Sequence, residues 1–146
     1  MTTLNELLQK GLIKKQPSSK EEIHNLFNIV ERDYKESASG HTEDWQFGIA
    51  YNAALKLANI LLRASGYRTS GIGHHFTTIV LIPNFLGKSR QDDADYLDAC
   101  RKKRNTLEYD CVGGITEKEV KELRKFVSEL KKEVTSWLSE NHPELL

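Results

Sequence analysis

The chain has few cysteines, and their positions argue against the roles that cysteine often plays. Cys100 and Cys111 are the only two in 146 residues. They do not form a Cys-x-x-Cys pair, and no cluster of histidines stands near them in the sequence. A structural zinc site usually needs about four such ligands at short spacing. We therefore expect no metal, no cofactor and no redox role.

The chain also lacks an excess of charge of either sign. Lys plus Arg and Asp plus Glu each number 21, so the formal net charge is zero. A protein that holds long nucleic acid mainly by neutralising phosphates usually carries a basic excess. Any contact with RNA must therefore be local and made by a small group of basic residues.

Long hydrophobic runs are absent as well. No apolar run reaches the length of about 18 residues that a transmembrane helix needs, and residues 1–6 show neither the basic region nor the apolar core of a signal peptide. Hydrophobic residues make up 38% of the chain and charged residues 29%, as in globular proteins. We expect a cytoplasmic protein without membrane contact, folded as one domain over residues 1–146. Its core would span about residues 20–140, after a short helix and a linker over 1–17.

Glycine and proline, at nine and three, are sparse and gather in a few places. Because both residues interrupt helices, the stretches between them are predicted to be helical. Ser18 with Glu21, and Thr116 with Glu119, fit capping boxes. The expected helices lie before Gly11, from Ser18 to about Gly40, from Thr42 or Asp44 to about Ala64, from His74 to about Pro83, from Asp92 or Asp93 toward Gly113, and from Thr116 onward.

These helices predict an all-α fold, an antiparallel up-and-down bundle of four main helices with shorter ones. The stretch 53–62 is apolar on nearly all sides, which indicates a central helix. His74–Ile82 also suits a strand, but a lone strand would have no partner, so a helix is predicted. The last helix carries a heptad seam that packs inside the bundle or against a second subunit: Val120, Leu123, Val127, Leu130, Val134 and Trp137.

The stretch 101–110 places several polar side chains on one face if it is helical. At about 100° per residue, five of them share an arc of about 140°. Cys100 and Leu107 fall on the other side and can face a core. The residues of this polar stripe are Arg101, Arg104, Asn105, Glu108 and Tyr109.

The polar stripe has two interpretations. It can be a solvated basic face in which Glu108 pairs with Arg101 or Arg104. Alternatively, the two guanidinium groups form a phosphate site, with Asn105 orienting the sugar-phosphate and Tyr109 stacking or donating a hydrogen bond. Because the usual pKa of tyrosine is about 10, this phenol is a poor general base at neutral pH, and chemistry from the stripe alone would be slow.

The segment 104–109, Arg-Asn-Thr-Leu-Glu-Tyr, resembles the signature of the HEPN superfamily. In that signature an arginine, often followed by a polar residue, precedes a histidine by five positions. Upstream, residues 44–55, the turn at 66–68 and the Gly-His-His of 73–75 are similar to the long second helix and following turn of small prokaryotic HEPN proteins. The resemblance covers about residues 20–140.

The resemblance implies an all-α bundle that forms a homodimer, with two copies of the motif across a shared cleft. It also implies metal-independent RNA cleavage in active members, in which the arginine stabilises the phosphorane and the histidine transfers a proton. By position, Arg104 and Asn105 match the motif, whereas Tyr109 occupies the place of the histidine. Many small members stand beside a minimal nucleotidyltransferase in toxin–antitoxin pairs, where a tyrosine near the motif accepts an adenylyl group. The resemblance makes Tyr109 a candidate acceptor.

Two histidines and several aromatic residues have less certain roles in the sequence. His74 and His75 would point about 100° apart on a helix, which does not suit one metal ion. They are expected to cap or to hydrogen-bond backbone carbonyls, or one of them replaces the missing motif histidine from a neighbouring helix. Five aromatic residues at helical spacing are expected in the core rather than on an RNA-stacking surface: Tyr34, Trp45, Phe47, Tyr51 and Trp137.

Three functions follow from these patterns. The first is a HEPN-type protein of a toxin–antitoxin-like system, with weak or no catalysis, that binds a nucleotide, RNA or a partner nucleotidyltransferase. The second is a metal-independent endoribonuclease toxin that uses Arg104 to stabilise charge and Tyr109 or His75 for proton transfer. The third is a scaffold bundle whose stripe is only a salt-bridged surface. The candidate catalytic residues are Arg104, Asn105 and Tyr109, and the candidate ligand-binding residues are Arg101, Arg104, Glu108 and His75.

Overall fold

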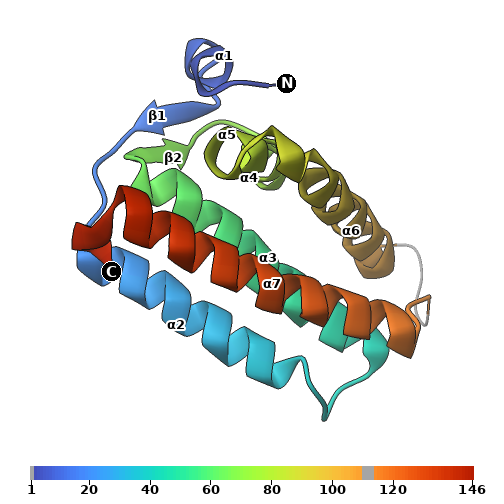
Figure 1. Cartoon of the computed structure of the whole chain (residues 1–146). Helices are drawn as coiled ribbons and strands as arrows, with labels where there is room; N and C mark the ends of the chain where they lie inside the picture. Colours follow the sequence, from blue (N-terminus) through green and yellow to red (C-terminus); the bar gives the residue numbers. More distant parts are fainter. Residues whose placement is uncertain (1, 110–113) are drawn as a thin grey trace.

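The computed structural model describes the backbone of residues 2–109 and 114–146, and the side chains of residues 2–106 and 114–146. The described chain is mostly helical, as the sequence predicts, with one small sheet beside the helices (Figure 1). None of the helices in these ranges is both long enough and apolar enough to cross a membrane. The elements are α1 (Leu4–Gln9), β1 (Ile13–Lys15), α2 (Lys20–Glu36), α3 (Glu43–Ala64), β2 (Tyr67–Thr69), α4 (His74–Val80), α5 (Ile82–Leu86), the 3₁₀ turn η1 (Lys88–Arg90), α6 (Gln91–Tyr109), α7 (Glu117–Asn141) and η2 (Pro143–Leu145).

Short polar side chains begin several helices by accepting a hydrogen bond from a backbone N–H in the first turn. Such a bond satisfies one of the donors that have no partner within the helix. The predicted capping box of Thr116 with Glu119 is confirmed. The box predicted at Ser18 is wrong by one residue, because Ser19 has the extended backbone of an N-cap and its Oγ accepts from Glu22 N at 3.1 Å. The residues that cap in this way are Thr3, Ser19, Thr42 and Thr116.

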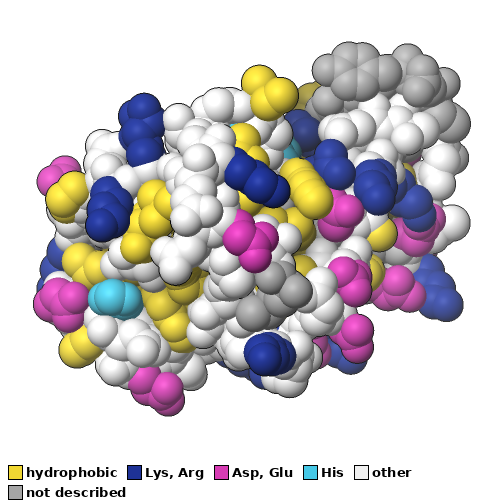
Figure 2. Space-filling model, turned by 90° about the horizontal axis from the view of Figure 1, so that it is seen from above, with side chains coloured by type: hydrophobic (Ala, Val, Ile, Leu, Met, Phe, Trp, Pro, Cys, Tyr) yellow, Lys and Arg dark blue, Asp and Glu magenta, His cyan; other side chains and the backbone are white. Residues whose placement is uncertain are grey.

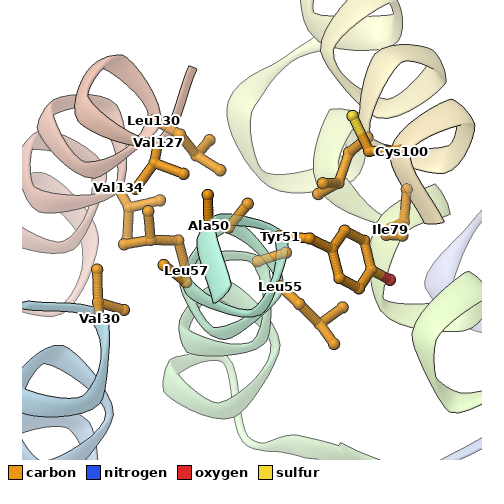
Figure 3. Packing of buried hydrophobic residues seen from close by; sticks show 14 of the residues in the cluster. Val30, Ala50, Tyr51, Leu55, Leu57, Ile79, Cys100, Val127, Leu130 and Val134 are labelled. Atoms are coloured by element: carbon orange, nitrogen blue, oxygen red, sulfur yellow. The ribbon is translucent and has the colours of Figure 1, made fainter. Parts of the chain in front are cut away.

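Helix α3 is the central element, as its apolar stretch predicts. Between residues 53 and 64 only Lys56 and Asn59 are not buried. Helices α2 and α7 pack along one side of α3, whereas α4 and α6 pack along another. Figure 3 shows Leu57 directed toward Val30 of α2 and Val134 of α7, and the ring of Tyr51 on the opposite side of α3. Helix α3 therefore joins the hydrophobic core to α4 and to α6, which carries the polar stripe.

The predicted seam of α7 is buried within this chain. Helix α7 packs against α3. Of the two alternatives left by the sequence, the seam therefore packs inside the bundle rather than against a second subunit. The last position of the seam is Leu138 rather than Trp137, because Leu138 is fully buried. Trp137 is partly buried and packs edge-on against Phe85, with ring centroids 5.7 Å apart. The buried residues are Val120, Leu123, Val127, Leu130, Val134 and Leu138.

Of the other aromatic residues expected in the core, three are found there and one is not. Phe47 and Tyr51 are buried, and Tyr34 is partly buried against the same core. The prediction for Trp45 is wrong, since 67% of its surface is exposed. It lies in the first turn of α3, and helical spacing shows which residues share a face without showing which face neighbouring helices cover.

The two-stranded sheet was not predicted. Strand β1 lies in the expected linker and β2 in the expected turn, and they pair antiparallel with Ile13 opposite Thr69. Three-residue strands are too short to show an alternating pattern, and their pairing joins distant parts of the chain. His74–Ile82 is helical as predicted, but Pro83 stands in the first turn of a second helix, α5, where proline is tolerated.

Arg63, near the end of α3, holds the sheet and the start of α2 in place. It is only 6% exposed, and its Nε and Nη2 atoms donate to both carboxylate oxygens of Glu22. Its Nη1 donates to the carbonyl oxygens of Gln16 at 2.9 Å and Tyr67 at 2.7 Å, and its Nη2 to that of Pro17 at 3.1 Å. One buried guanidinium thus connects α3, α2, β2 and the segment between β1 and α2.

Candidate functional site

The polar stripe lies on α6, which is helical from Gln91 to Tyr109, as expected. The side chains of Leu107, Glu108 and Tyr109 lie outside the described residues. The predicted roles of Glu108 and Tyr109 therefore stay predictions, as does any pairing of Glu108 with an arginine. The part of the stripe that the structure describes consists of Arg101, Arg104 and Asn105, each partly exposed.

The opposite side of α6 faces the core, as the sequence predicts. Cys100 is 5% exposed, and burial raises the pKa of its thiol to about 11. A thiol with such a pKa is almost wholly protonated at neutral pH and is a poor nucleophile. No group of three or more His, Cys, Asp or Glu residues is placed to hold a metal ion in the described ranges.

Arg104 lies above a buried tyrosine of the central helix. Its guanidinium carbon is 5.4 Å from the centroid of the Tyr51 ring, within the usual range of a cation–π contact. Tyr51 is 1% exposed, and its hydroxyl lies 3.1 Å from Nδ1 of His75 in a hydrogen bond. Helices α6, α3 and α4 therefore bring an arginine, a phenol and an imidazole together.

Arg101 lies beside this group and is held by an acidic residue one turn earlier in α6. Its Nε donates to Oδ1 of Asp98 at 2.8 Å, and its guanidinium carbon is 5.5 Å from the Phe76 ring centroid. Partial burial raises the pKa of Asp98, but the hydrogen bonds and positive charges of Arg101 and Lys102 outweigh it and lower that pKa below its usual range. The local acidic partner of Arg101 is thus Asp98, which the sequence analysis did not consider.

The charged groups that act on the pKa of His75 are cations. Burial lowers the pKa of His75, and the positive charges of Arg104, Lys56, Arg101 and His74 lower it further. His75 is therefore neutral at pH 7. Burial also raises the pKa of Tyr51, which Arg104 and Arg101 oppose only in part, so the phenol keeps its proton. Neutral hydrogen-bonding groups surrounded by cations create a local positive potential that favours an anion.

The two adjacent histidines have different roles. His74 Nδ1 lies 3.2 Å from Oγ1 of Thr69, and its Nε2 bonds the carbonyl of Gly71. This confirms the predicted structural role for His74, which holds the turn before α4. His75 instead joins Tyr51 and lies near the arginines of α6, as the alternative prediction required of one histidine.

Three residues of this site were not assigned to it from the sequence. They are Lys56, Phe76 and Tyr51, the last of which contacts Arg104. Lys56 had a signal, since it is the one charged residue in the apolar stretch 53–62. Tyr51 was assigned to the core, which is correct but incomplete, because its ring also contacts Arg104 and its hydroxyl bonds His75. Phe76 had no signal, since nothing in the sequence shows that α4 packs beside α6.

The face of the molecule seen in Figure 2 carries no broad field of charge of one sign. Figure 2 shows Lys and Arg side chains interspersed with hydrophobic and acidic ones over the visible face. Ile72 and Phe76, at 86% and 41% exposure, are among the exposed large hydrophobic residues. This surface fits a local contact with a small charged group rather than a long track for nucleic acid.

We expect the free energy of unfolding to decrease as the pH falls below about 6.5. The pKa of His75 is lower in the folded chain than its usual value of 6.5. The unfolded chain therefore binds more protons in the interval below 6.5, so stability present above this pH is lost as the pH falls through it. Urea unfolding at about pH 7.5 and about pH 5.5 measures the loss, and the His75→Gln variant should show a smaller one. The same loss in both proteins would contradict this assignment.

Comparisons of the chain with protein families, with characterised proteins and with solved structures find no match. The resemblance to the HEPN superfamily thus stays an expectation that rests on residues of the sequence itself. Function must be argued from the chemistry of the site.

Proposed function

We propose that Arg101, Arg104 and His75 bind a phosphate group of a nucleotide or of an RNA segment. The observation that carries this proposal is the position of the Arg104 guanidinium above Tyr51, whose hydroxyl bonds the neutral His75. Lys56 and Arg101 add positive charge at the same place. Arg101 shares its charge with Asp98, and the planar guanidinium groups suit the oxygens of phosphate.

The wider biological role is proposed from the resemblance of residues 104–109. In this role the chain is a HEPN-type protein with weak or no catalysis in a toxin–antitoxin-like system. It works as a homodimer or with a partner nucleotidyltransferase, which adenylylates Tyr109. The phosphate site supports this role because each of these partners would bring an anionic nucleotide or RNA to the surface of α6.

Replacing Arg104 with alanine is expected to weaken binding of a fluorescent single-stranded RNA oligonucleotide by about 10- to 100-fold, since hydrogen bonds to charged groups contribute about 1.5–3 kcal/mol. Arg104→Lys keeps the charge and loses the planar arrangement of donors, so its affinity for the RNA should lie between those of the wild-type chain and Arg104→Ala. Fluorescence anisotropy at one fixed salt concentration measures both.

The matched control is Arg32→Ala on α2. It removes the same charge from a side chain that is 62% exposed on a helix that also packs against α3. Arg32 Nε pairs with the buried Asp33 at 3.0 Å, so thermal unfolding of this variant must first show that the fold is intact. If Arg32→Ala and Arg104→Ala weaken RNA binding equally, then binding depends only on the net charge of the chain. That result would contradict the proposed site.

A second candidate function is metal-independent RNA cleavage, and the observation that favours it is the hydrogen bond of His75 to Tyr51, over whose ring the Arg104 guanidinium lies. A neutral imidazole can take the proton of a ribose 2′-hydroxyl. The 2′-oxygen then attacks phosphorus, the bond to the 5′-oxygen breaks, and the imidazolium returns the proton to that oxygen while Arg104 stabilises the charge. The products are a 2′,3′-cyclic phosphate and a 5′-hydroxyl.

Incubation of the protein with single-stranded RNA in EDTA separates the two functions. Cleavage that is lost in both Arg104→Ala and His75→Gln supports the enzyme. RNA that stays intact at high protein concentration, yet binds in a manner dependent on Arg104, supports binding without catalysis. The scaffold hypothesis is supported if the Arg104→Ala variant changes the stability of the fold alone.

A further inference from the structure

Phe76 is an aromatic residue whose exposure the hydrophobic core does not explain. It is 41% exposed and belongs to neither of the two hydrophobic clusters of the described chain. It lies on α4, and its ring stands next to the proposed phosphate site because the Arg101 guanidinium carbon is 5.5 Å from the ring centroid.

The Phe76 ring of α4 contacts Arg101 of α6. The guanidinium carbon of Arg101 lies 5.5 Å from the ring centroid, and the hydrogen bond to Asp98 at 2.8 Å holds that guanidinium in place. Both partners are therefore constrained: the ring by the short helix α4 and the cation by its acidic neighbour. The site thus presents an aromatic face and a fixed guanidinium beside the cations around His75.

Such an arrangement matches the two parts of a nucleotide. Aromatic rings stack on any nucleobase, and arginine adds to this stacking, whereas cations bind the phosphate. A base within a duplex is already stacked on both sides and cannot use the ring, so the base must be unpaired.

We infer that the ligand of this site carries an unpaired nucleobase that stacks on Phe76 while its phosphate lies at Arg104 and His75. This inference rests on the proposed function and makes it specific: the site takes a nucleotide or a single strand, and not a base-free phosphate compound. Phe76 is then the residue that determines specificity, and Arg104 the residue that determines charge recognition.

The experiment compares two probes, ribose 5-phosphate and adenosine 5′-monophosphate, by isothermal titration calorimetry at one salt concentration. The wild-type chain should bind the nucleotide about tenfold more tightly than the base-free sugar phosphate. Phe76→Leu keeps apolar bulk and removes the aromatic face. It should bind the nucleotide about tenfold more weakly than the wild-type chain does and should bind the sugar phosphate with unchanged affinity. Phe76→Tyr should retain the wild-type affinity for the nucleotide.

Ile72→Ala is the control for simple loss of apolar surface, because Ile72 is a still more exposed hydrophobic residue shortly before Phe76 in the chain. It should leave the affinities for both probes as in the wild type. Arg104→Ala should weaken both probes by a similar factor, since both carry a phosphate. Thermal unfolding of each variant checks that the fold is intact.

The outcomes separate this inference from the proposed function. Equal affinity of the wild-type chain for the two probes, or an equal loss for both in Phe76→Leu, overturns the base-stacking role and leaves the phosphate site standing. Failure of the wild-type chain to bind either probe, or binding that Arg104→Ala does not change, overturns the proposed function and this inference with it.

Discussion

Replacing Arg63 with methionine is expected to lower the free energy of unfolding by about 3 kcal/mol or more. The substitution keeps much of the length of the side chain and removes every donor. The carboxylate of Glu22 loses its bidentate partner, and the carbonyl groups of Gln16, Pro17 and Tyr67 lose a charged donor. Arg63 itself is buried, and each hydrogen bond from its charged donors contributes about 1.5–3 kcal/mol. Water replaces part of this at the Glu22 side chain, which is 39% exposed.

Guanidinium chloride unfolding followed by circular dichroism measures the loss, and the thermal midpoint should fall by about 10 °C. Arg68→Met is the matched control. Arg68 is exposed on β2, one residue beyond the Tyr67 carbonyl that Arg63 binds, and its substitution should change stability by less than about 0.5 kcal/mol. Similar losses in the two variants would show that Arg63 does not hold these segments together.

Replacing Leu57 with alanine is expected to lower the free energy of unfolding by about 3–5 kcal/mol. Leu57 is 0% exposed, and Figure 3 shows it between Val30 of α2 and Val134 of α7. The three helices cannot move together to fill the resulting cavity without losing other contacts. The free-energy cost of the cavity therefore adds to the lost transfer free energy of the side chain.

The same substitution at Leu146, which is 41% exposed at the end of the chain, is the control and should change stability by less than about 0.5 kcal/mol. Leu57→Met, which nearly conserves volume, should lose less than about 1.5 kcal/mol. Urea unfolding at one pH gives all three values. A loss at Leu57 no larger than that at Leu146 would contradict the central place of α3 in the core.

The contrast between Leu57 and Arg63 also shows how far sequence patterns reach. The burial of Leu57 follows from its place in an apolar stretch of a predicted helix, and the structure confirms it. Arg63 stands near the end of the same helix, and a charged residue there is typically exposed. Its burial depends on carbonyl groups supplied by two other segments, and no periodic pattern in the sequence encodes these.

The candidate site shows the same division. The helical arrangement of Arg101, Arg104 and Asn105 depends on neighbours in the sequence, so the polar stripe could be predicted. The contacts of Arg104 with Tyr51 and of Arg101 with Phe76 join residues from different helices. The sequence contained all these residues, but it could not show that α3, α4 and α6 meet at this place.

What the sequence by itself determined is local: where helices begin, through side chains such as Thr42 and Thr116, which face of α7 is apolar, and that polar residues line one side of α6. These features depend on residues within about one or two helical turns of each other. Only the tertiary structure decided that β1 pairs with β2, that Arg63 is buried, and that His75 lies among cations. Each of these depends on segments far apart in the chain, whose approach is set by burial of the common core rather than by any short pattern.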